Sequence, residues 1–233
     1  MEVTEGEFGR LHVSPAEAPV AYLLLGHGAR GGIDSVELAA LADHLPARGI
    51  TVGRYEQPWK VAGRPLAGPA ASLDRAWQAV LSQVKAMVPG LPLFTGGRSA
   101  GARVACRGFA PDQYGLVLSA FPLHPPGRPD RSRIDELSAV AGSALVVQTE
   151  RDPFGGADEL LAALAAEGAP APARLVRLEG SSHGPDTRSA AGQARLPVDL
   201  ARIVDEVERF VAARVGQGPA APGLTLLQPG TYP

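Results

Sequence analysis

Short apolar runs rich in valine and leucine alternate with longer stretches of helical period along most of this chain. Such alternation is typical of a parallel β-sheet whose strands are joined by crossover helices. We predict seven strands, over Phe8–Val13, Ala21–Leu25, Ile50–Tyr55, Leu91–Thr95, Gly115–Ala120, Ala144–Thr149 and Arg174–Leu178. We predict helices over Ser35–Arg48, Ser72–Val88, Ala100–Phe109, Ala157–Glu167 and Val198–Val215. The fold class is therefore expected to be α/β with a mostly parallel sheet.

The length and composition of the chain fit one soluble globular domain. Its 233 residues are 45% hydrophobic and carry a formal net charge of −2, which is typical of that class. We predict one domain over residues 1–215 and a tail over residues 216–233, where Gly, Pro and Ala occur without periodicity. No apolar run approaches the roughly 20 residues that a membrane span needs, so we expect no membrane partner.

Cysteine usage and basic residues bear on the compartment and the partners. The first ten residues are acidic and polar, unlike a secretory signal. The single cysteine, Cys106, excludes an internal disulfide and fits a reducing compartment, so we expect a cytoplasmic protein. Only Lys60 and Lys85 are lysines, and the arginines are scattered among acids at a pI of about 6.2. Nucleic-acid binding favours clustered basic residues, so we expect no nucleic-acid partner; we assign no oligomeric state.

The motif G-x-S-x-G occurs twice, around Ser99 and around Ser182. In a parallel sheet, functional residues gather where the strands end at their carboxyl edge. Ser99 follows a predicted strand and precedes a predicted helix, and the flanking Gly97 and Gly101 leave room for a sharp turn. Ser182 is followed by Pro185 and a polar run instead of a helix, and no histidine lies beyond His183 to serve it. Ser99 is therefore the favoured nucleophile.

A nucleophilic serine needs a base and an acid that orients the base. His183 lies just past the last predicted strand, in a loop of small residues, which favours it as the base. The strand before it ends in "QTERDPFG", which offers Asp152 and Glu150. Asp152 is favoured because it lies in the loop proper, whereas Glu150 can still belong to the strand end. His124 also follows a strand, but no acid-bearing strand separates it from Ser99, so we expect it to line the pocket.

The loop after the strand Ala21–Leu25, "GHGARGG", is expected to supply one backbone amide to an oxyanion. Ala29 N–H is the favoured donor, with Gly28 next to it. The second donor is Ala100 N–H, at the start of the helix that follows the serine.

The same loop also permits an alternative from another class. Residues 26–31 read G-x-G-x-x-G, and Glu56 lies about 25 residues further on, which is a nominal dinucleotide-binding fingerprint. However, His27 stands between the first two glycines, where a pyrophosphate must approach closely. An isolated glycine fingerprint is weak evidence, and a dinucleotide site leaves the order of Ser, Asp and His unexplained.

The motifs GHGA, GRSAG, DPFG and SSHG, in this order, resemble the α/β-hydrolase superfamily. More narrowly, "GHGARGG", "GGRSAGARVA", "FPLHPPGRP" and "QTERDPFG" resemble its small dienelactone-hydrolase-like branch, and within it the testis-expressed protein 30 and KAT8 regulatory complex subunit 3 group. The resemblance covers about residues 8–215. It implies a catalytic triad of Ser99, Asp152 and His183. Dienelactone hydrolase itself has a cysteine nucleophile, whereas Cys106 here is expected in the core.

We therefore expect an α/β-hydrolase fold with about seven strands flanked by helices. The segment Pro122–Glu136 is too short for a large lid domain, so we expect an open site. Its walls are predicted to include Gly28, Tyr55, Trp59 and His124. The expected activity is hydrolysis of a small carboxylic ester or thioester through an acyl-enzyme, with no metal or organic cofactor. A binding or scaffolding protein that keeps the fold is the alternative.

Overall fold

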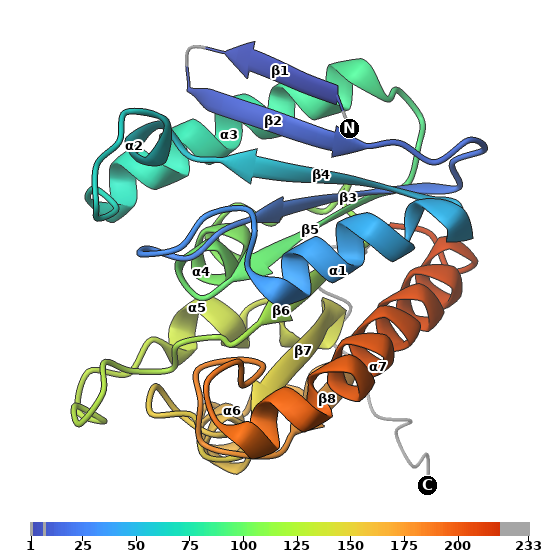
Figure 1. Cartoon of the computed structure of the whole chain (residues 1–233). Helices are drawn as coiled ribbons and strands as arrows, with labels where there is room; N and C mark the ends of the chain where they lie inside the picture. The colour runs from blue at the N-terminus through green and yellow to red at the C-terminus, as the bar shows by residue number, and fades with distance from the viewer. Residues whose placement is uncertain (1, 7, 220–233) are drawn as a thin grey trace, which may run out of the picture.

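The computed structural model describes residues 2–6 and 8–219, which are built around an eight-stranded sheet (Figure 1). The strand order is β1-β2-β4-β3-β5-β6-β7-β8. β2 pairs antiparallel with both β1 and β4, and all other neighbours are parallel. The strands are β1 Glu2–Gly6, β2 Gly9–Ser14, β3 Ala21–Gly26, β4 Ile50–Glu56, β5 Leu93–Arg98, β6 Gly115–Ser119, β7 Ala144–Thr149 and β8 Arg174–Leu178.

Helices cover both faces of the sheet. The α-helices are α1 Val36–His44, α2 Pro58–Val61, α3 Ala70–Met87, α4 Ala100–Arg107, α5 Ile134–Ser138, α6 Ala157–Ala166 and α7 Ala190–Val215. Two single-turn helices, η1 Pro46–Arg48 and η2 Ala141–Ser143, precede strands β4 and β7. α1 and α7 lie side by side on one face, and α3, α4, α5 and α6 pack on the other (Figure 1).

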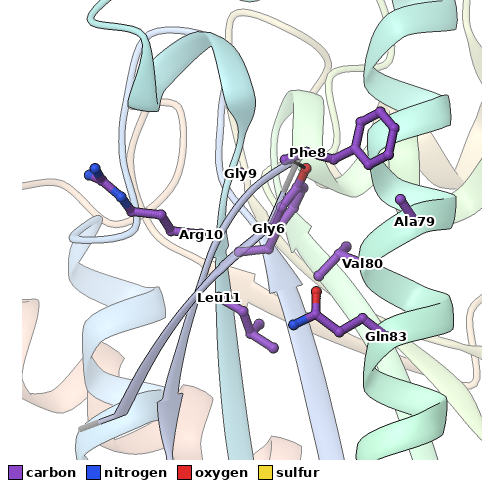
Figure 2. A pocket seen from close by; sticks show the side chains of 9 residues that line it. Gly6, Phe8, Gly9, Arg10, Leu11, Ala79, Val80 and Gln83 are labelled. Carbon is purple, nitrogen blue, oxygen red and sulfur yellow. Dashed lines mark hydrogen bonds between the residues drawn. The ribbon is translucent and has the colours of Figure 1, made fainter.

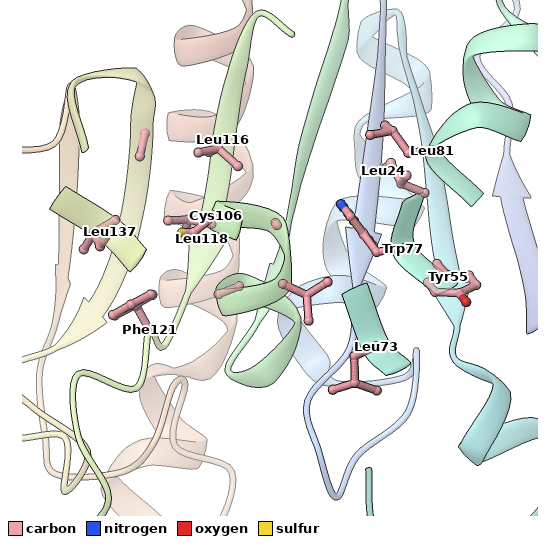
Figure 3. Packing of buried hydrophobic residues seen from close by; sticks show 14 of the residues in the cluster. Leu24, Tyr55, Leu73, Trp77, Leu81, Cys106, Leu116, Leu118, Phe121 and Leu137 are labelled. Atoms are coloured by element: carbon pink, nitrogen blue, oxygen red, sulfur yellow. The ribbon is translucent and has the colours of Figure 1, made fainter. Parts of the chain in front are cut away.

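Each face has its own hydrophobic core. On the face of α3 and α4, Trp77, Phe121 and Cys106 lie in one buried cluster (Figure 3). Cys106 is only 4% exposed, which confirms the prediction that it is a core residue. On the opposite face, Phe94 and Phe210 pack edge to face with ring centroids 6.1 Å apart. The two cores make the sheet a rigid support, because side chains on both of its faces are close-packed.

The structure confirms the predicted fold class and all seven predicted strands, and it adds one strand. β1 was not predicted because each of its residues is exposed, so it lacks the alternation that marks a half-buried strand. The last helix was predicted to begin at Val198 but begins at Ala190, with Pro197 inside it. The side chain of Ser189 caps this helix by accepting a hydrogen bond of 2.9 Å from Gly192 N. The extra turns are mostly exposed, so they show no apolar period.

The carboxyl edge of the sheet holds the residues that carry chemistry. β5 runs to Arg98, three residues further than predicted, so Ser99 follows the strand directly. The connection from β6 to β7 contains only α5 and η2 as regular helices, and in the described ranges no separate lid domain covers the edge. No helix in the described part of the chain is long and apolar enough to cross a membrane. The tail predicted from residue 216 falls largely on residues 220–233, which lie outside the described residues.

Candidate active site

Ser99 lies on a sharp turn between β5 and α4. Its backbone angles are φ 53° and ψ −112°, a region that non-glycine residues adopt rarely and at a cost in free energy. A Cβ atom on Gly97 would lie 2.3 Å from the carbonyl oxygen of Gly26, and one on Gly101 would lie 2.4 Å from the same atom. The two flanking glycines of the motif are therefore required by the close approach of the turn to the end of β3. The turn lifts the serine hydroxyl out of the sheet edge.

Ser99, His183 and Asp152 form a continuous hydrogen-bonded chain. His183 Nε2 lies 2.9 Å from Ser99 Oγ, and His183 Nδ1 lies 2.8 Å and 3.1 Å from the two carboxylate oxygens of Asp152. A carboxylate can only accept, so Nδ1 carries the proton and Nε2 is free to accept from the serine hydroxyl. The Asp152 side chain is fully buried, and Phe154 N donates to its Oδ1 over 2.8 Å. Asp152 is thus fixed in the position that orients the imidazole.

The two alternatives that the sequence left open are placed elsewhere. Glu150 is half-exposed, and its carboxylate lies 3.7 Å from the guanidinium of Arg151. Ser182 Oγ donates to the carbonyl oxygen of Gly184 over 2.7 Å. The structure therefore brings together the favoured serine, acid and histidine and leaves out the runner-up acid and serine.

Two backbone amides are available next to Ser99. In the described part of the chain, neither Ala29 N–H nor Ala100 N–H has a hydrogen-bond partner, and both residues line the same cavity as Ser99. Ala100 begins α4, and the first amides of a helix have no partner within it. Donors of this kind can stabilise negative charge that develops on a carbonyl oxygen.

His27 holds the loop that presents Ala29. The His27 ring is buried, Nδ1–H donates to the carbonyl oxygen of Gly28 over 2.9 Å, and Nε2 accepts from Gln57 N over 3.1 Å. The C=O and N–H of a trans peptide point in opposite directions. Since the Gly28 carbonyl faces His27, the Ala29 N–H of the same peptide unit faces away from His27. Burial lowers the pKa of His27, which favours the neutral ring that this arrangement needs.

Arg98 connects three elements behind the candidate nucleophile. Its Nε donates to Glu37 of α1 over 2.7 Å, and its Nη2 donates to the carbonyl oxygen of His183 over 2.6 Å. The Glu37 carboxylate is almost completely buried and also accepts from Ser119 Oγ over 3.1 Å. Through these two contacts Arg98 joins the end of β5 to α1 and to the loop that carries His183.

A cavity of about 610 Å³ opens at the serine. Gly28, predicted as a pocket residue, packs beside Ser99, since a Cβ there would be 3.5 Å from Ser99 Cβ, but it is not among the residues that line the cavity. The Phe154 ring packs on the His183 ring with centroids 4.3 Å apart. The cavity is lined by Ala29, Arg30, Gly31, Arg98, Ser99, Ala100, Arg103, Pro122, Pro126, Arg133, Phe154 and His183.

Three side chains predicted as pocket walls lie outside this lining. Tyr55 is buried against α3, and its hydroxyl donates to Phe8 O. It borders a separate small pocket. Figure 2 shows this pocket between the β1–β2 hairpin and α3. Trp59 is buried beside His27 and donates to Gln57 Oε1 over 3.1 Å. His124 is buried and lies 2.9 Å from Glu159. All three follow or end strands, but their side chains turn into packed regions.

Other residues of the site were not predicted. The roles of Glu37, Arg98 and His27 were missed, although His27 lies within the predicted oxyanion loop and Arg98 within the serine motif. The dinucleotide alternative does not fit, because the glycine loop packs against Arg98 and Ser99 and bears the amide of Ala29. In residues 2–6 and 8–219, no group of three or more His, Cys, Asp or Glu side chains is placed to hold a metal ion.

Comparisons with known proteins agree with this architecture. The "Alpha/beta hydrolase domain" family model matches residues 19–212. A solved alpha-beta serine hydrolase homologue from Coxiella burnetii is similar at a TM-score of 0.66 and 17% identity, covering 88% of this chain and 96% of that one. A serine hydrolase described as lacking a lid, from Xanthomonas campestris, gives a TM-score of 0.63 and 21% identity over 95% of both chains.

Est1E from Butyrivibrio proteoclasticus is similar at a TM-score of 0.65 and 12% identity, covering 91% of this chain and 98% of that one. No curated protein sequence matches the chain. At these identities the solved structures show a shared fold. The family model, however, spans most of the sequence, and the protein therefore belongs to the alpha/beta hydrolase domain family.

Proposed function

We propose that this protein hydrolyses small carboxylic esters or thioesters with Ser99 as nucleophile, His183 as base and Asp152 as the acid that orients the base. The observation that carries the proposal is the hydrogen-bonded chain from Asp152 through His183 to Ser99, with 2.8 Å and 2.9 Å at its two links. The resemblance of the motifs to the dienelactone-hydrolase-like branch agrees with it, with serine in place of cysteine.

In the first half-reaction, Ser99 Oγ forms a bond to the carbonyl carbon while its proton passes to His183 Nε2. The carbonyl π electrons move to oxygen, and the amides of Ala29 and Ala100 donate to that oxyanion. When the tetrahedral intermediate collapses, the C–O or C–S bond of the substrate breaks. The alkoxide or thiolate takes the proton from His183 and leaves an acyl-enzyme.

In the second half-reaction, water attacks the acyl carbon and gives its proton to His183. A second tetrahedral intermediate forms in the same oxyanion site. Its collapse breaks the bond to Ser99 Oγ, which recovers the proton, and releases the carboxylic acid. These steps need only the residues of the chain and water, and they use no metal or organic cofactor.

Hydrolysis of p-nitrophenyl acetate and butyrate tests the proposal. We expect the wild-type protein to release p-nitrophenolate with saturation, and Ser99→Ala to be inactive above the uncatalysed rate. Ser182→Ala is the matched control, because it removes the serine of the competing motif and is expected to remain active. Equal rates for wild type and Ser99→Ala would overturn the proposal.

Labelling with a fluorophosphonate probe separates the enzyme from the alternative of a scaffold that keeps the fold. We expect wild type and Ser182→Ala to be labelled and Ser99→Ala to remain unlabelled. A folded wild-type protein that reacts with neither the probe nor any ester or thioester of a small panel would favour the scaffold.

A further inference from the structure

We propose that the cavity beside Ser99 selects anionic substrates, namely esters or thioesters that carry a carboxylate away from the scissile bond, and that Arg133 and Arg30 bind this carboxylate. The inference rests on the proposed function and adds the substrate class. It is carried by the charges that line the cavity.

Among residues 2–6 and 8–219, four guanidinium groups and no acidic side chain line the cavity. The four belong to Arg30, Arg98, Arg103 and Arg133. The Asp152 carboxylate does not face the cavity, because its side chain is fully buried behind His183. A substrate in this cavity therefore meets positive charge.

Two of the four arginines are already neutralised by the protein. Arg98 pairs with the buried Glu37 over 2.7 Å. Arg103 makes a two-pronged contact with Glu136, with Nε and Nη2 at 2.7 Å and 2.5 Å from its two oxygens. These ion pairs occupy the side of each guanidinium that a ligand carboxylate would use.

The cluster around Glu136 nevertheless keeps one positive charge in excess. Glu136 is shared between Arg103 and Arg107, and Arg107 also pairs with Asp74. Arg133 lies near Arg103 and Glu136, so the cluster holds three guanidinium groups and two carboxylates. Arg133 is the third guanidinium, and within the described ranges it pairs with neither carboxylate.

Arg133 is held in place but not neutralised. Its Nη1 donates to the carbonyl oxygen of Pro122 over 3.2 Å, which uses one of the five donors of a guanidinium. Among the described residues it forms no ion pair. Burial and the repulsion of Arg103 lower its pKa, as expected for a cation that lacks an anion. A buried or half-buried charge is stabilised by a partner of opposite sign, and a bound carboxylate would supply it.

Arg30 adds a second free cation at the mouth of the cavity. It directly follows Ala29, the predicted oxyanion donor, and its side chain is exposed. In the part of the chain that the structure describes, its guanidinium has neither a hydrogen bond nor an ion pair. Arg133 and Arg30 are thus two unneutralised guanidinium groups on the wall of the cavity that Ser99 also lines.

Two pairs of esters test the charge preference, since the carboxylate can lie on either side of the scissile bond. In the first pair, mono-4-nitrophenyl adipate carries a carboxylate in its acyl part, and its methyl ester is the neutral counterpart. In the second pair, 4-acetoxybenzoate carries the carboxylate in its alcohol part, and its methyl ester is the neutral counterpart. In at least one pair we expect wild-type kcat/KM to be about tenfold higher for the anionic member, as a charge-assisted hydrogen bond supports. A ratio of one or less in both pairs would overturn the inference.

Substitutions of Arg133 test whether this residue causes the preference for anionic esters. We expect Arg133→Gln to bring the anionic-to-neutral ratio close to one, mainly through KM for the anionic ester, and Arg133→Lys to keep part of it. Arg131→Gln is the matched control, because it removes the same charge from an exposed position of the same loop and is expected to keep the wild-type ratio. Arg30→Gln is expected to lower the ratio less. An unchanged ratio in folded Arg133→Gln would overturn the assignment.

Binding to Ser99→Ala separates this inference from the proposed function. Calorimetry with the four uncleaved esters measures affinity without turnover. We expect the preferred anionic ester to bind about tenfold more tightly than its methyl ester, and Ser99→Ala/Arg133→Gln to lose that difference. Equal affinities within both pairs overturn the charge preference even if wild type hydrolyses neutral esters. A charge preference in binding without any hydrolysis by wild type would instead overturn the proposed function alone.

Discussion

The guanidinium of Arg98 donates a hydrogen bond of 2.6 Å to the backbone carbonyl oxygen of His183. Arg98 directly precedes Ser99, so the residue next to the candidate nucleophile holds the loop of the candidate base. The Nε of the same guanidinium donates to the buried carboxylate of Glu37 over 2.7 Å. We infer that this ion pair sets the distance between Ser99 Oγ and His183 Nε2.

Replacing Arg98 by methionine is expected to lower the free energy of unfolding by about 3 kcal/mol, because Glu37 is left buried without its partner. We also expect kcat for ester hydrolysis to fall more than KM changes, because the loop of His183 loses its anchor. Urea denaturation and steady-state kinetics measure the two effects. Arg128→Met, which breaks an exposed pair with Asp130, is expected to leave the stability close to that of wild type, because solvent screens exposed ion pairs.

The double variant Glu37→Leu/Arg98→Met separates positioning from stability. Removal of both charges is expected to restore part of the stability, since no unpaired buried charge remains. The low kcat is expected to persist, because the contact with the His183 carbonyl is still missing. Recovery of kcat in parallel with stability would show that Arg98 has no positioning role.

Asp152→Asn is expected to lower kcat by about 10³- to 10⁴-fold with little change in KM, since an amide in place of the carboxylate permits the wrong tautomer of His183. Glu150→Gln is the matched control, because Glu150 lies in the same loop but pairs with Arg151 near solvent. We expect it to keep wild-type activity. The reverse ranking of the two variants would assign the orienting acid to Glu150.

Gly101→Ala tests the steric basis of the serine turn. The added methyl carbon would lie 2.4 Å from the carbonyl oxygen of Gly26, so the turn must move away from β3. We expect a loss of stability of about 2 kcal/mol and a large loss of kcat. Gly31→Ala adds the same methyl group where no atom lies within 4 Å and is expected to keep wild-type stability. Equal thermal unfolding of the two variants would contradict this explanation.

The fold and the order of Ser99, Asp152 and His183 could be predicted because both depend on simple regularities. Parallel strands bring their carboxyl ends to one edge, so residues that are far apart in sequence but follow strands meet there. By contrast, β1 has no buried residue, and its pattern carries no apolar alternation. Its pairing depends on the exposed edge of β2, which the sequence does not mark.

The support of the site could not be predicted, because it depends on which way each side chain turns. Glu37 and Arg98 are 61 positions apart, and no local pattern indicates that a helix carries a buried carboxylate toward a strand end. Tyr55 was expected at the pocket since it ends a strand, yet its ring turns to the face of α3 and packs near Trp77. A position at the carboxyl end of a strand places a residue at that edge of the sheet, but it does not determine on which face of the sheet the side chain lies.

Cys106 is expected to be inert toward thiol reagents in the folded protein. It is almost fully buried in the core of the α3 and α4 face, and burial raises the pKa of its thiol, so little thiolate forms at neutral pH. We expect Ellman's reagent to titrate no thiol in native buffer and one thiol per chain in 6 M guanidinium chloride, where the core is open. Rapid reaction in native buffer would show that this core opens.

The free energy of unfolding is expected to decrease as the pH is lowered, because His27 resists protonation in the folded protein. Burial lowers the pKa of His27 below its ordinary value of 6.5 in the folded protein. As the pH falls below 6.5, the unfolded chain binds a proton at this residue while the folded chain stays neutral. The free energy of unfolding therefore decreases from pH 6.5 down to the lowered pKa of the native state, and it is unaffected by His27 above that window.

The comparison of His27→Gln with His44→Gln isolates this effect. Urea denaturation at several pH values between 5 and 8 gives the slope of unfolding free energy against pH for each protein. His27→Gln is expected to be less stable at pH 8, because the contacts to Gly28 O and Gln57 N change, but its slope below pH 6.5 is expected to be shallower than that of wild type. His44 is exposed at the end of α1, so His44→Gln is expected to keep the wild-type slope. A wild-type slope in His27→Gln would mean that the buried ring accepts a proton without cost, which its hydrogen bond from Gln57 N to Nε2 argues against.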